Sequence, residues 1–303
     1  MRFFRLFHTF ASVFVINNRD SMQRINILLL TLLFALTGWA QGNHSFSGIL
    51  MVHYGTRNDA SRAATVDRLN ALVAERFPQS KVVEAYVAPA VIKALAKRGI
   101  VKPTVSQALD SLRNMGCRRV VVQSTMLLDG NMTDALQADL DRKRAFFEQI
   151  EVDKPLLWSV DDCRSMVAMI ARHLGNSVGK AQVVLVGHGS DNAANAMYSQ
   201  MDYMLQDEGH AQWHVGTIEG YPTRECVERR LQASHQKQVV LVPLLYIAGN
   251  HLREDIDGVW RKELEAKGYN VNVVKEGLGE MKEIQEMILD RIKTMLDNQT
   301  KHK

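Results

Sequence analysis

The segment Val183-Val184-Leu185-Val186-Gly187-His188-Gly189-Ser190 decides the fold class. Its uninterrupted apolar run is typical of a strand buried on both faces, and the glycines that follow predict a turn. From Ser47 onward, similar short runs alternate with amphipathic stretches of helical period. Such alternation indicates parallel sheets whose strands are joined by crossover helices. We therefore predict an α/β fold.

The same patterns predict the order of the elements. Strands are expected over residues 48–54, 81–86, 119–123, 182–186, 214–218, 238–245 and 270–274. Helices are expected over residues 60–76, 104–115, 133–150, 161–174, 225–236, 255–267 and 281–298. No low-complexity linker divides the chain, and the glycine-containing segment 175–180 is the best boundary.

The two parts of the chain on either side of this boundary resemble each other. Val52-His53-Tyr54-Gly55-Thr56 is similar to Val186-Gly187-His188-Gly189-Ser190. Leu128-Asp129-Gly130-Asn131-Met132 is similar to Ile247-Ala248-Gly249-Asn250-His251, and each of these segments follows an apolar strand. We therefore predict a duplicated α/β unit, with one half over residues 47–177, the other over 178–303, and one helix-flanked parallel sheet in each.

Composition excludes several classes of protein. The 303 residues are 46% hydrophobic and 23% charged, which is ordinary for a globular protein. The net charge of +4 comes without a dense run of Lys and Arg, so no nucleic-acid partner is expected. The three cysteines are far apart and form no CxxC motif, so a zinc knuckle is unsupported, and buried free thiols are expected rather than a disulfide.

The amino-terminal residues have the pattern of a secretory signal. Arg24 precedes a short apolar run over residues 25–36, and small residues follow it at Gly38 and Ala40. We predict a signal peptide over residues 1–42, with Met22 as an alternative start, and export to the periplasm. The run is too short for a stable membrane span.

Three side chains capable of binding a metal come directly after predicted strands of the second half. They are His188, Glu219 and His251. Because parallel strands end at one edge of their sheet, and ligands bind beyond that edge, we expect the three to share one rim. Two imidazoles and a carboxylate suit divalent cobalt, iron, nickel or zinc. The aligned residues of the first half, Tyr54, Tyr86 and Met132, are poor ligands for such ions.

Each residue of this set also has a structural interpretation. A lone histidine at a strand end is more often a hydrogen-bonded structural residue than a ligand. Glu219 alone is compatible with a carboxylate at a helix N-terminus, and His251 alone with a solvated loop. Their common position at three strand ends favours the metal site over these alternatives.

Further side chains near these turns are candidates for substrate binding. Arg57 and Arg253 suit bidentate pairing with carboxylates, although ordinary surface charge explains them equally well. Ser190 is a third candidate for a substrate contact. A phosphate loop and a hydrolase nucleophile are both poorly supported, because the segment around Ser190 has neither the GxGxxG nor the GxSxG spacing. His53, at the end of the first strand, is a weaker candidate for an assisting residue.

The residues quoted above resemble those of the anaerobic sirohydrochlorin cobaltochelatase family, CbiK type. The likeness covers the mature chain from Ser47 to Asn298. It is carried by Gly55-Thr56, Val186-Gly187-His188-Gly189-Ser190, Glu219-Gly220-Tyr221-Pro222, Val242-Pro243-Leu244-Leu245 and Ala248-Gly249-Asn250-His251. The family also has a histidine in the segment over residues 123–128, where this chain has Met126.

The resemblance implies a chelatase-like fold of two α/β halves around a cleft. It implies that His188, Glu219 and His251 hold the metal and that His188 and His251 are catalytic. The expected partners are a tetrapyrrole and a divalent metal, Co²⁺ first and Fe²⁺ or Ni²⁺ as alternatives, with no other cofactor; a homo-oligomer is left open. Most members of the family are cytoplasmic, so the export signal is unusual.

The sequence therefore predicts insertion of a metal into sirohydrochlorin, with His188 accepting a pyrrole proton. One rival is iron insertion of the ferrochelatase type. A second is an exported protein that binds a metal or tetrapyrrole without catalysis, which the absence of the family histidine at Met126 favours. A plain structural α/β protein is the third.

Overall fold

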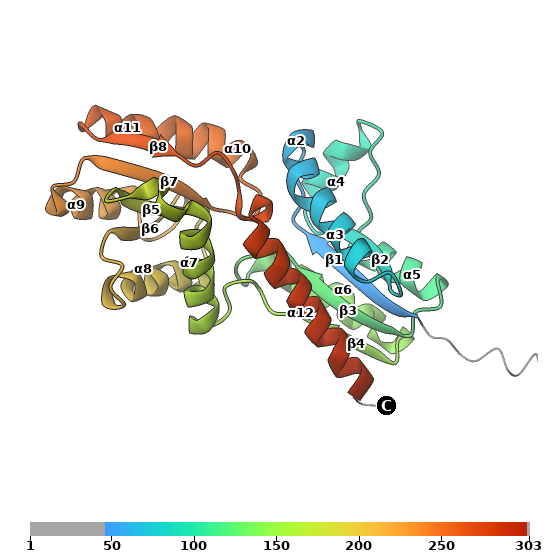
Figure 1. Cartoon of the computed structure of the whole chain (residues 1–303). Helices are drawn as coiled ribbons and strands as arrows, with labels where there is room; N and C mark the ends of the chain where they lie inside the picture. Colours follow the sequence, from blue (N-terminus) through green and yellow to red (C-terminus); the bar gives the residue numbers. More distant parts are fainter. Residues whose placement is uncertain (1–45, 302–303) are drawn as a thin grey trace, which may run out of the picture. The chain divides into compact units, whose positions relative to one another are not determined.

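The computed structural model describes residues 46–301, which form one compact unit (Figure 1). The predicted signal peptide over residues 1–42 lies outside the described residues. Within residues 46–301, no helix combines the length and the apolar character that a membrane span requires.

Two four-stranded parallel sheets form the framework, and their strand orders are equivalent. The first sheet has the order β2-β1-β3-β4 and the second the order β6-β5-β7-β8. Their bounds are Ser47–His53 (β1), Lys81–Tyr86 (β2), Arg119–Ser124 (β3), Gln149–Val152 (β4), Gln182–Gly187 (β5), Trp213–Thr217 (β6), Gln238–Leu244 (β7) and Asn270–Val273 (β8). The prediction of two similar halves, each with a parallel sheet, is confirmed.

Helices connect successive strands, as parallel pairing requires. They are α2 (Asp59–Arg62), α3 (Arg68–Arg76), α4 (Pro89–Ala96), α5 (Val105–Asn114), α6 (Asn131–Lys143), α7 (Val160–Leu174), α8 (Ala196–Asp207), α9 (Arg224–Ser234), α10 (Gly249–His251), α11 (Arg261–Ala266) and α12 (Lys282–Lys301). Two π-helical stretches interrupt them, η1 (Ala63–Asp67) and η5 (Leu252–Trp260). Each lies in the helical segment that follows a central strand, β1 or β7. Such stretches often lie at functional sites.

The structure differs from the predicted elements at four places. The helix predicted over residues 133–150 ends at Lys143, and β4 follows at Gln149–Val152. The short alternating pattern of these four residues suits a half-buried strand. Helices α4 and α8 were not predicted. The helix predicted from residue 255 already begins at Gly249, so His251 belongs to the helical segment rather than to a loop.

The last helix returns to the first sheet. Arg119 Nη1, at the start of β3, donates to the carbonyl of Gln299 in α12 at 2.8 Å. Gln299 Nε2 donates to the carbonyl of Val120 at 3.1 Å. Figure 1 shows α12, in red, running along β3 and β4, whereas α7 lies beside the second sheet. The covering helices are thus exchanged between the halves, and one hydrophobic cluster contains residues of both sheets.

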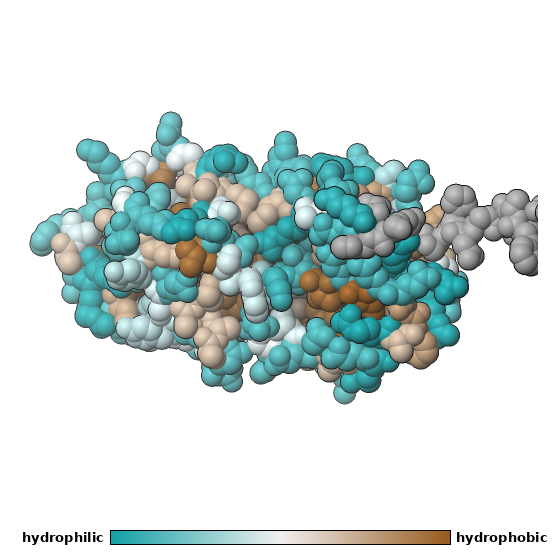
Figure 2. Space-filling view, turned by 90° about the horizontal axis from the view of Figure 1, so that it is seen from below, coloured by the Kyte–Doolittle hydropathy of each residue, from teal (hydrophilic) through white to brown (hydrophobic). Residues whose placement is uncertain are grey.

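The face seen from below in Figure 2 is mostly hydrophilic, with apolar side chains gathered in small patches. The apolar residues of the central strands lie inside. Val183 to Val186 of β5 and Ile49 to Val52 of β1 are fully buried. Both sheets therefore have apolar cores, and their chemistry must lie at the strand ends.

Candidate metal centre

His188 is held at the carboxyl end of β5 by tight backbone packing. Gly189 has a φ of +91°, and an added Cβ there would lie 2.5 Å from the amide nitrogen of Gly220, so only glycine fits without strain. The amide of Glu219 donates to the carbonyl of His188 at 2.8 Å. The turn after β5 and the turn after β6 are therefore joined through the backbone at His188 and Gly189.

The second histidine comes from the segment after β7. His251 is the last residue of α10, where the π-helix η5 begins. The rings of His188 and His251 lie edge to face, with their centroids 4.8 Å apart and their planes at 88°. The ends of β5 and β7 thus bring together two imidazoles that lie far apart in the sequence.

Both imidazoles are oriented by their Nδ1 atoms. His188 Nδ1 lies 3.1 Å from the carbonyl oxygen of Gly189, and His251 Nδ1 lies 2.8 Å from Asp255 Oδ2. A carbonyl and a carboxylate only accept hydrogen bonds, so each Nδ1 carries the proton and donates it. The lone pair of each neutral ring is then on Nε2, the atom left for a metal.

Asp255 was not predicted as part of the site. It lies four residues after His251 in the same helical segment and contacts His251 from there. The i,i+4 spacing was the available signal, but it identifies a neighbour only when the residues are known to be helical. The prediction began the helix at residue 255 and so placed His251 in a turn.

The Glu219 carboxylate does not join the two imidazoles in a closed site. Its side chain is exposed, while its backbone is bound to His188. Within residues 46–301, no group of three or more His, Cys, Asp or Glu side chains is arranged as a metal site. The arrangement is a pair of imidazoles with a carboxylate anchored nearby, and Glu219 as a ligand stays a prediction.

Removing the Asp255 carboxylate should weaken metal binding without removing a ligand. In Asp255→Ala, the His251 ring loses the acceptor that fixes its orientation and its tautomer. We expect Co²⁺ affinity to fall by about 10- to 100-fold, the usual cost of losing such a partner. Titration calorimetry with Co²⁺ measures this. Glu254→Ala, one position earlier and exposed, is the matched control, and equal affinities of the two variants would contradict the role of Asp255.

The ladders identify the counterparts of this site in the first half. Val52 pairs with Ser124 across β1 and β3, and Val186 pairs with Pro243 across β5 and β7. Equal spacing from Ser124 and Pro243 then matches Met132 with His251, as the sequence comparison predicted.

One of the aligned positions was wrong. His53 pairs with Tyr86 across β1 and β2, and Gly187 pairs with Thr217 across β5 and β6. Tyr86 therefore corresponds to Thr217 and not to Glu219. Tyr86 precedes Pro89 by three residues, as Glu219 precedes Pro222, but the two prolines follow the ends of β2 and β6 at different distances.

Comparisons with known proteins identify the family. The family model "Cobalt chelatase (CbiK)" matches residues 47–297. The chain belongs to this family.

Its relatives match over nearly their whole length. The sirohydrochlorin cobaltochelatase of Salmonella typhimurium is 26% identical, and the alignment covers 82% of this chain and 96% of that protein. The sirohydrochlorin cobaltochelatase CbiKC of Nitratidesulfovibrio vulgaris is 29% identical, with 81% and 89% covered. The resemblance stated from the sequence is confirmed.

Solved structures confirm the fold. The sirohydrochlorin chelatase SirB of Bacillus subtilis, in complex with cobalt, superposes with a TM-score of 0.59 at 15% identity, covering 84% of this chain and 96% of that one. The structure of CbiX gives a TM-score of 0.55 at 19% identity, with 82% and 98% covered. The two-half α/β architecture is thus that of chelatases.

The candidate substrate contacts of this chelatase lie at different depths. Arg57 is exposed just after β1, and Ser190 is half-buried beside His188, with its amide donating to Asn195 Oδ1 at 2.9 Å. Arg253 is exposed but turns back to Asn250, where its Nη2 donates to Oδ1 at 2.6 Å. Their role toward a substrate stays a prediction.

His53 is a core residue rather than an assisting group in the cleft. Its side chain is completely buried, and burial lowers its pKa from 6.5 to about 4. His53 Nε2 lies 3.0 Å from Asn70 Oδ1, and Asn70 Nδ2 donates to Glu84 at 3.0 Å. His53 Nδ1 lies 3.1 Å from Thr125 Oγ1, which ties the end of β1 to the end of β3.

Met126 is also buried, at 9% exposure, so its side chain is turned into the core of the first half. Its carbonyl accepts the amide of Leu156 at 3.0 Å. This segment of the chain is therefore fixed by its backbone, and the paired imidazoles of His188 and His251 lie in the second half.

Proposed function

We propose that this protein is a sirohydrochlorin cobaltochelatase, which inserts Co²⁺ into sirohydrochlorin. The observation that carries the proposal is the pair His188 and His251, whose rings lie 4.8 Å apart with both Nε2 atoms free of protein partners in the described structure. The names of the two relatives, which this chain matches over 96% and 89% of their lengths, support the choice of metal and macrocycle.

The open geometry suits a metal that must be released again. A structural metal site is closed by four protein ligands, whereas a catalytic one keeps positions open. Here two imidazoles lie edge to face, and Glu219 is exposed with its backbone bonded to His188. We propose that the Glu219 carboxylate joins the imidazoles when Co²⁺ arrives, and that pyrrole nitrogens replace these ligands one after another.

Insertion also has to dispose of protons. A divalent metal that enters the free macrocycle displaces two pyrrole protons, so that charge is conserved. When the metal leaves His188, its Nε2 lone pair becomes free at the macrocycle face, and neutral imidazole is a competent base near neutral pH. We propose that His188 takes the first of these protons. Arg57 and Arg253 are the proposed partners for the carboxylates of the macrocycle.

The donor set does not by itself distinguish cobalt from iron or nickel, because imidazole and carboxylate ligands suit all three ions. The decisive experiment mixes the purified protein with sirohydrochlorin and Co²⁺, Fe²⁺ or Ni²⁺ and follows the change in macrocycle absorbance. We expect the fastest turnover with Co²⁺. Faster iron insertion would replace the proposal by the iron reaction, and tight binding without insertion would identify a binding protein.

We also propose that the protein is exported and acts in the periplasm. The support is the sequence alone: the apolar run over residues 25–36, with Arg24 before it and Gly38 and Ala40 after it. Expression of the full chain in a Gram-negative host, followed by fractionation and mass spectrometry, tests this. A periplasmic protein beginning near residue 41 or 43 is expected, and an intact cytoplasmic chain would contradict export.

A further inference from the structure

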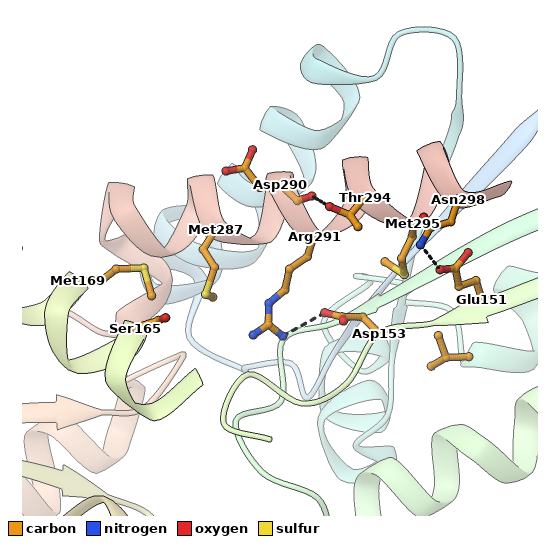
Figure 3. Close-up of a pocket in the computed structure, with 11 residues that line it drawn as sticks. Glu151, Asp153, Ser165, Met169, Met287, Asp290, Arg291, Thr294, Met295 and Asn298 are labelled. Atoms are coloured by element: carbon orange, nitrogen blue, oxygen red, sulfur yellow. Dashed lines mark hydrogen bonds and ion pairs between the residues drawn. The ribbon is translucent and has the colours of Figure 1, made fainter. Parts of the chain in front are cut away.

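A cavity of about 580 Å³ opens to solvent on the side of the molecule formed by α12, α7 and the end of β4 (Figure 3). Methionines of α7 and α12, Met169 and Met287, line one end of it. The Arg291 side chain extends from α12 toward the segment that follows β4, and Figure 3 marks its contact with Asp153. None of these residues belongs to the proposed metal site.

Arg291 holds together two parts of the chain that cross between the halves. Its Nη1 donates to Asp153 Oδ2 at 3.2 Å, and its Nη2 donates to Asp162 Oδ1 at 2.5 Å. Asp153 begins the crossover segment over residues 153–157, and Asp162 lies in the first turn of α7. These charge-assisted bonds join largely buried side chains, which makes them stronger than surface ion pairs.

The crossover segment in turn supports the chain that continues from β3. The amides of Leu156 and Leu157 donate to the carbonyls of Met126 and Leu127 at 3.0 and 2.8 Å. Asp153 Oδ2, which binds Arg291, also accepts from Gln123 Nε2 of β3 at 2.8 Å. The segment over residues 126–130, called here the β3 turn, is therefore hydrogen-bonded to the crossover segment, which Arg291 binds through Asp153.

The β3 turn reaches the half that carries the histidines. An added Cβ at Gly130 would lie 2.7 Å from Nδ2 of the Asn192 side chain, so this side chain packs directly against the backbone of Gly130. Asn192 lies in the loop that begins at His188, where its amide donates to Ser190 Oγ at 3.3 Å. The β3 turn is therefore the part of the first half that faces the His188 loop, and a shift of this turn would change the surface opposite His188.

We propose that Arg291 is a positioning residue for the chelatase reaction, acting through the crossover segment on the β3 turn, where it shapes the macrocycle site. This inference rests on the proposed function for its activity readout. The two halves then have separate roles. The histidines of the second half hold the metal, while Arg291 fixes the position of the β3 turn of the first half, against which the macrocycle lies.

Arg291→Ala tests the proposal, and the cavity permits a chemical rescue. Because the cavity is open, added guanidinium can occupy the place of the lost side chain between Asp153 and Asp162. We expect KM for sirohydrochlorin to rise about 10- to 100-fold through misplacement of the β3 turn, with a smaller change in kcat and unchanged Co²⁺ affinity. Millimolar guanidinium should restore KM, whereas urea, which is planar but uncharged, should not. Lys293→Ala, exposed on the same helix, is the matched control.

Amide exchange provides a readout that does not require activity. In Arg291→Ala, the amides of Leu156 and Leu157 should exchange faster, and guanidinium should slow them again. If the wild-type protein inserts no metal, the proposed function fails while the exchange result still tests Arg291. Unchanged exchange and KM, or a loss of activity that guanidinium does not reverse while the Tm falls, would overturn the positioning role.

Discussion

Replacing His188 or His251 by alanine is expected to abolish cobalt insertion. Each substitution removes one of two imidazoles that lie 4.8 Å apart, and the remaining one cannot hold the ion alone. Loss of a group that only orients a ligand costs about 10- to 100-fold, so loss of the ligand itself should lower kcat/KM by more than about a thousandfold. Absorbance assays with sirohydrochlorin and Co²⁺ measure this for each variant.

Two controls separate chemistry from folding. Both histidines are only partly buried, and His251 is 41% exposed, so their removal should leave the Tm close to that of the wild type. His210→Ala, at an exposed position with no role in the site, should keep full activity. A His188→Ala or His251→Ala protein that inserts cobalt at the wild-type rate would show that the metal is held elsewhere.

The pairing of His188 with His251 could be predicted from the sequence because it follows from topology. Each histidine comes soon after a buried apolar run, and parallel strands end at the same edge of a sheet. The strand order β6-β5-β7-β8 then places the ends of β5 and β7 side by side. The proximity of the two histidines therefore depends on the strand order and not on side-chain conformation.

The partners of these side chains could not be predicted in the same way. Asp255 contacts His251 because the helical segment begins at Gly249, and boundaries of helices are poorly encoded in local patterns. The position of the Glu219 carboxylate depends on its side-chain rotamer, and the sequence pattern does not predict rotamers. Tyr86 and Glu219 share the same spacing to a following proline, but the turns after β2 and β6 differ in length, so this spacing does not identify equivalent positions.

The packing of α12 on the first sheet shows a second limit. Its apolar face is readable from the sequence as a stripe of helical period, but a stripe does not identify the surface that covers it. The contacts of Gln299 with β3 and of Arg291 with Asp153 join residues more than 130 positions apart. The predicted boundary at residues 175–180 therefore separates the two sheets of this protein, but it does not separate the helices that cover them.

Acidification from pH 6.5 to pH 4 is expected to remove a large part of the folding free energy. Burial lowers the pKa of His53 and of His214 from 6.5 to about 4. Both rings are neutral and hydrogen-bonded through Nε2, His53 to Asn70 and His214 to Gln182 at 2.8 Å. His214 Nδ1 is buried without a hydrogen-bond partner in the described structure, so a proton there would be buried unpaired.

The sign follows from proton binding in the two states. Between pH 6.5 and 4, the unfolded chain protonates these histidines while the folded chain does not, so the unfolded state gains stability as the pH falls. The contribution is fully present above pH 6.5 and fully lost at about pH 4. A difference of 2.5 pKa units corresponds to about 3 kcal/mol for each histidine.

Urea unfolding at pH 7, 6, 5 and 4.5 measures the effect, and substitutions assign it to the two rings. His53→Gln keeps a donor for Asn70 and an acceptor for Thr125 but cannot be protonated, so its free energy of unfolding should fall less steeply with acid than that of the wild type. His214→Gln should do the same, and the double variant should show both changes, because the two rings lie in different sheets. His210→Gln, at an exposed position, should keep the wild-type slope. Equal slopes in the wild type and all four variants would mean that other groups, such as paired carboxylates, cause the acid sensitivity.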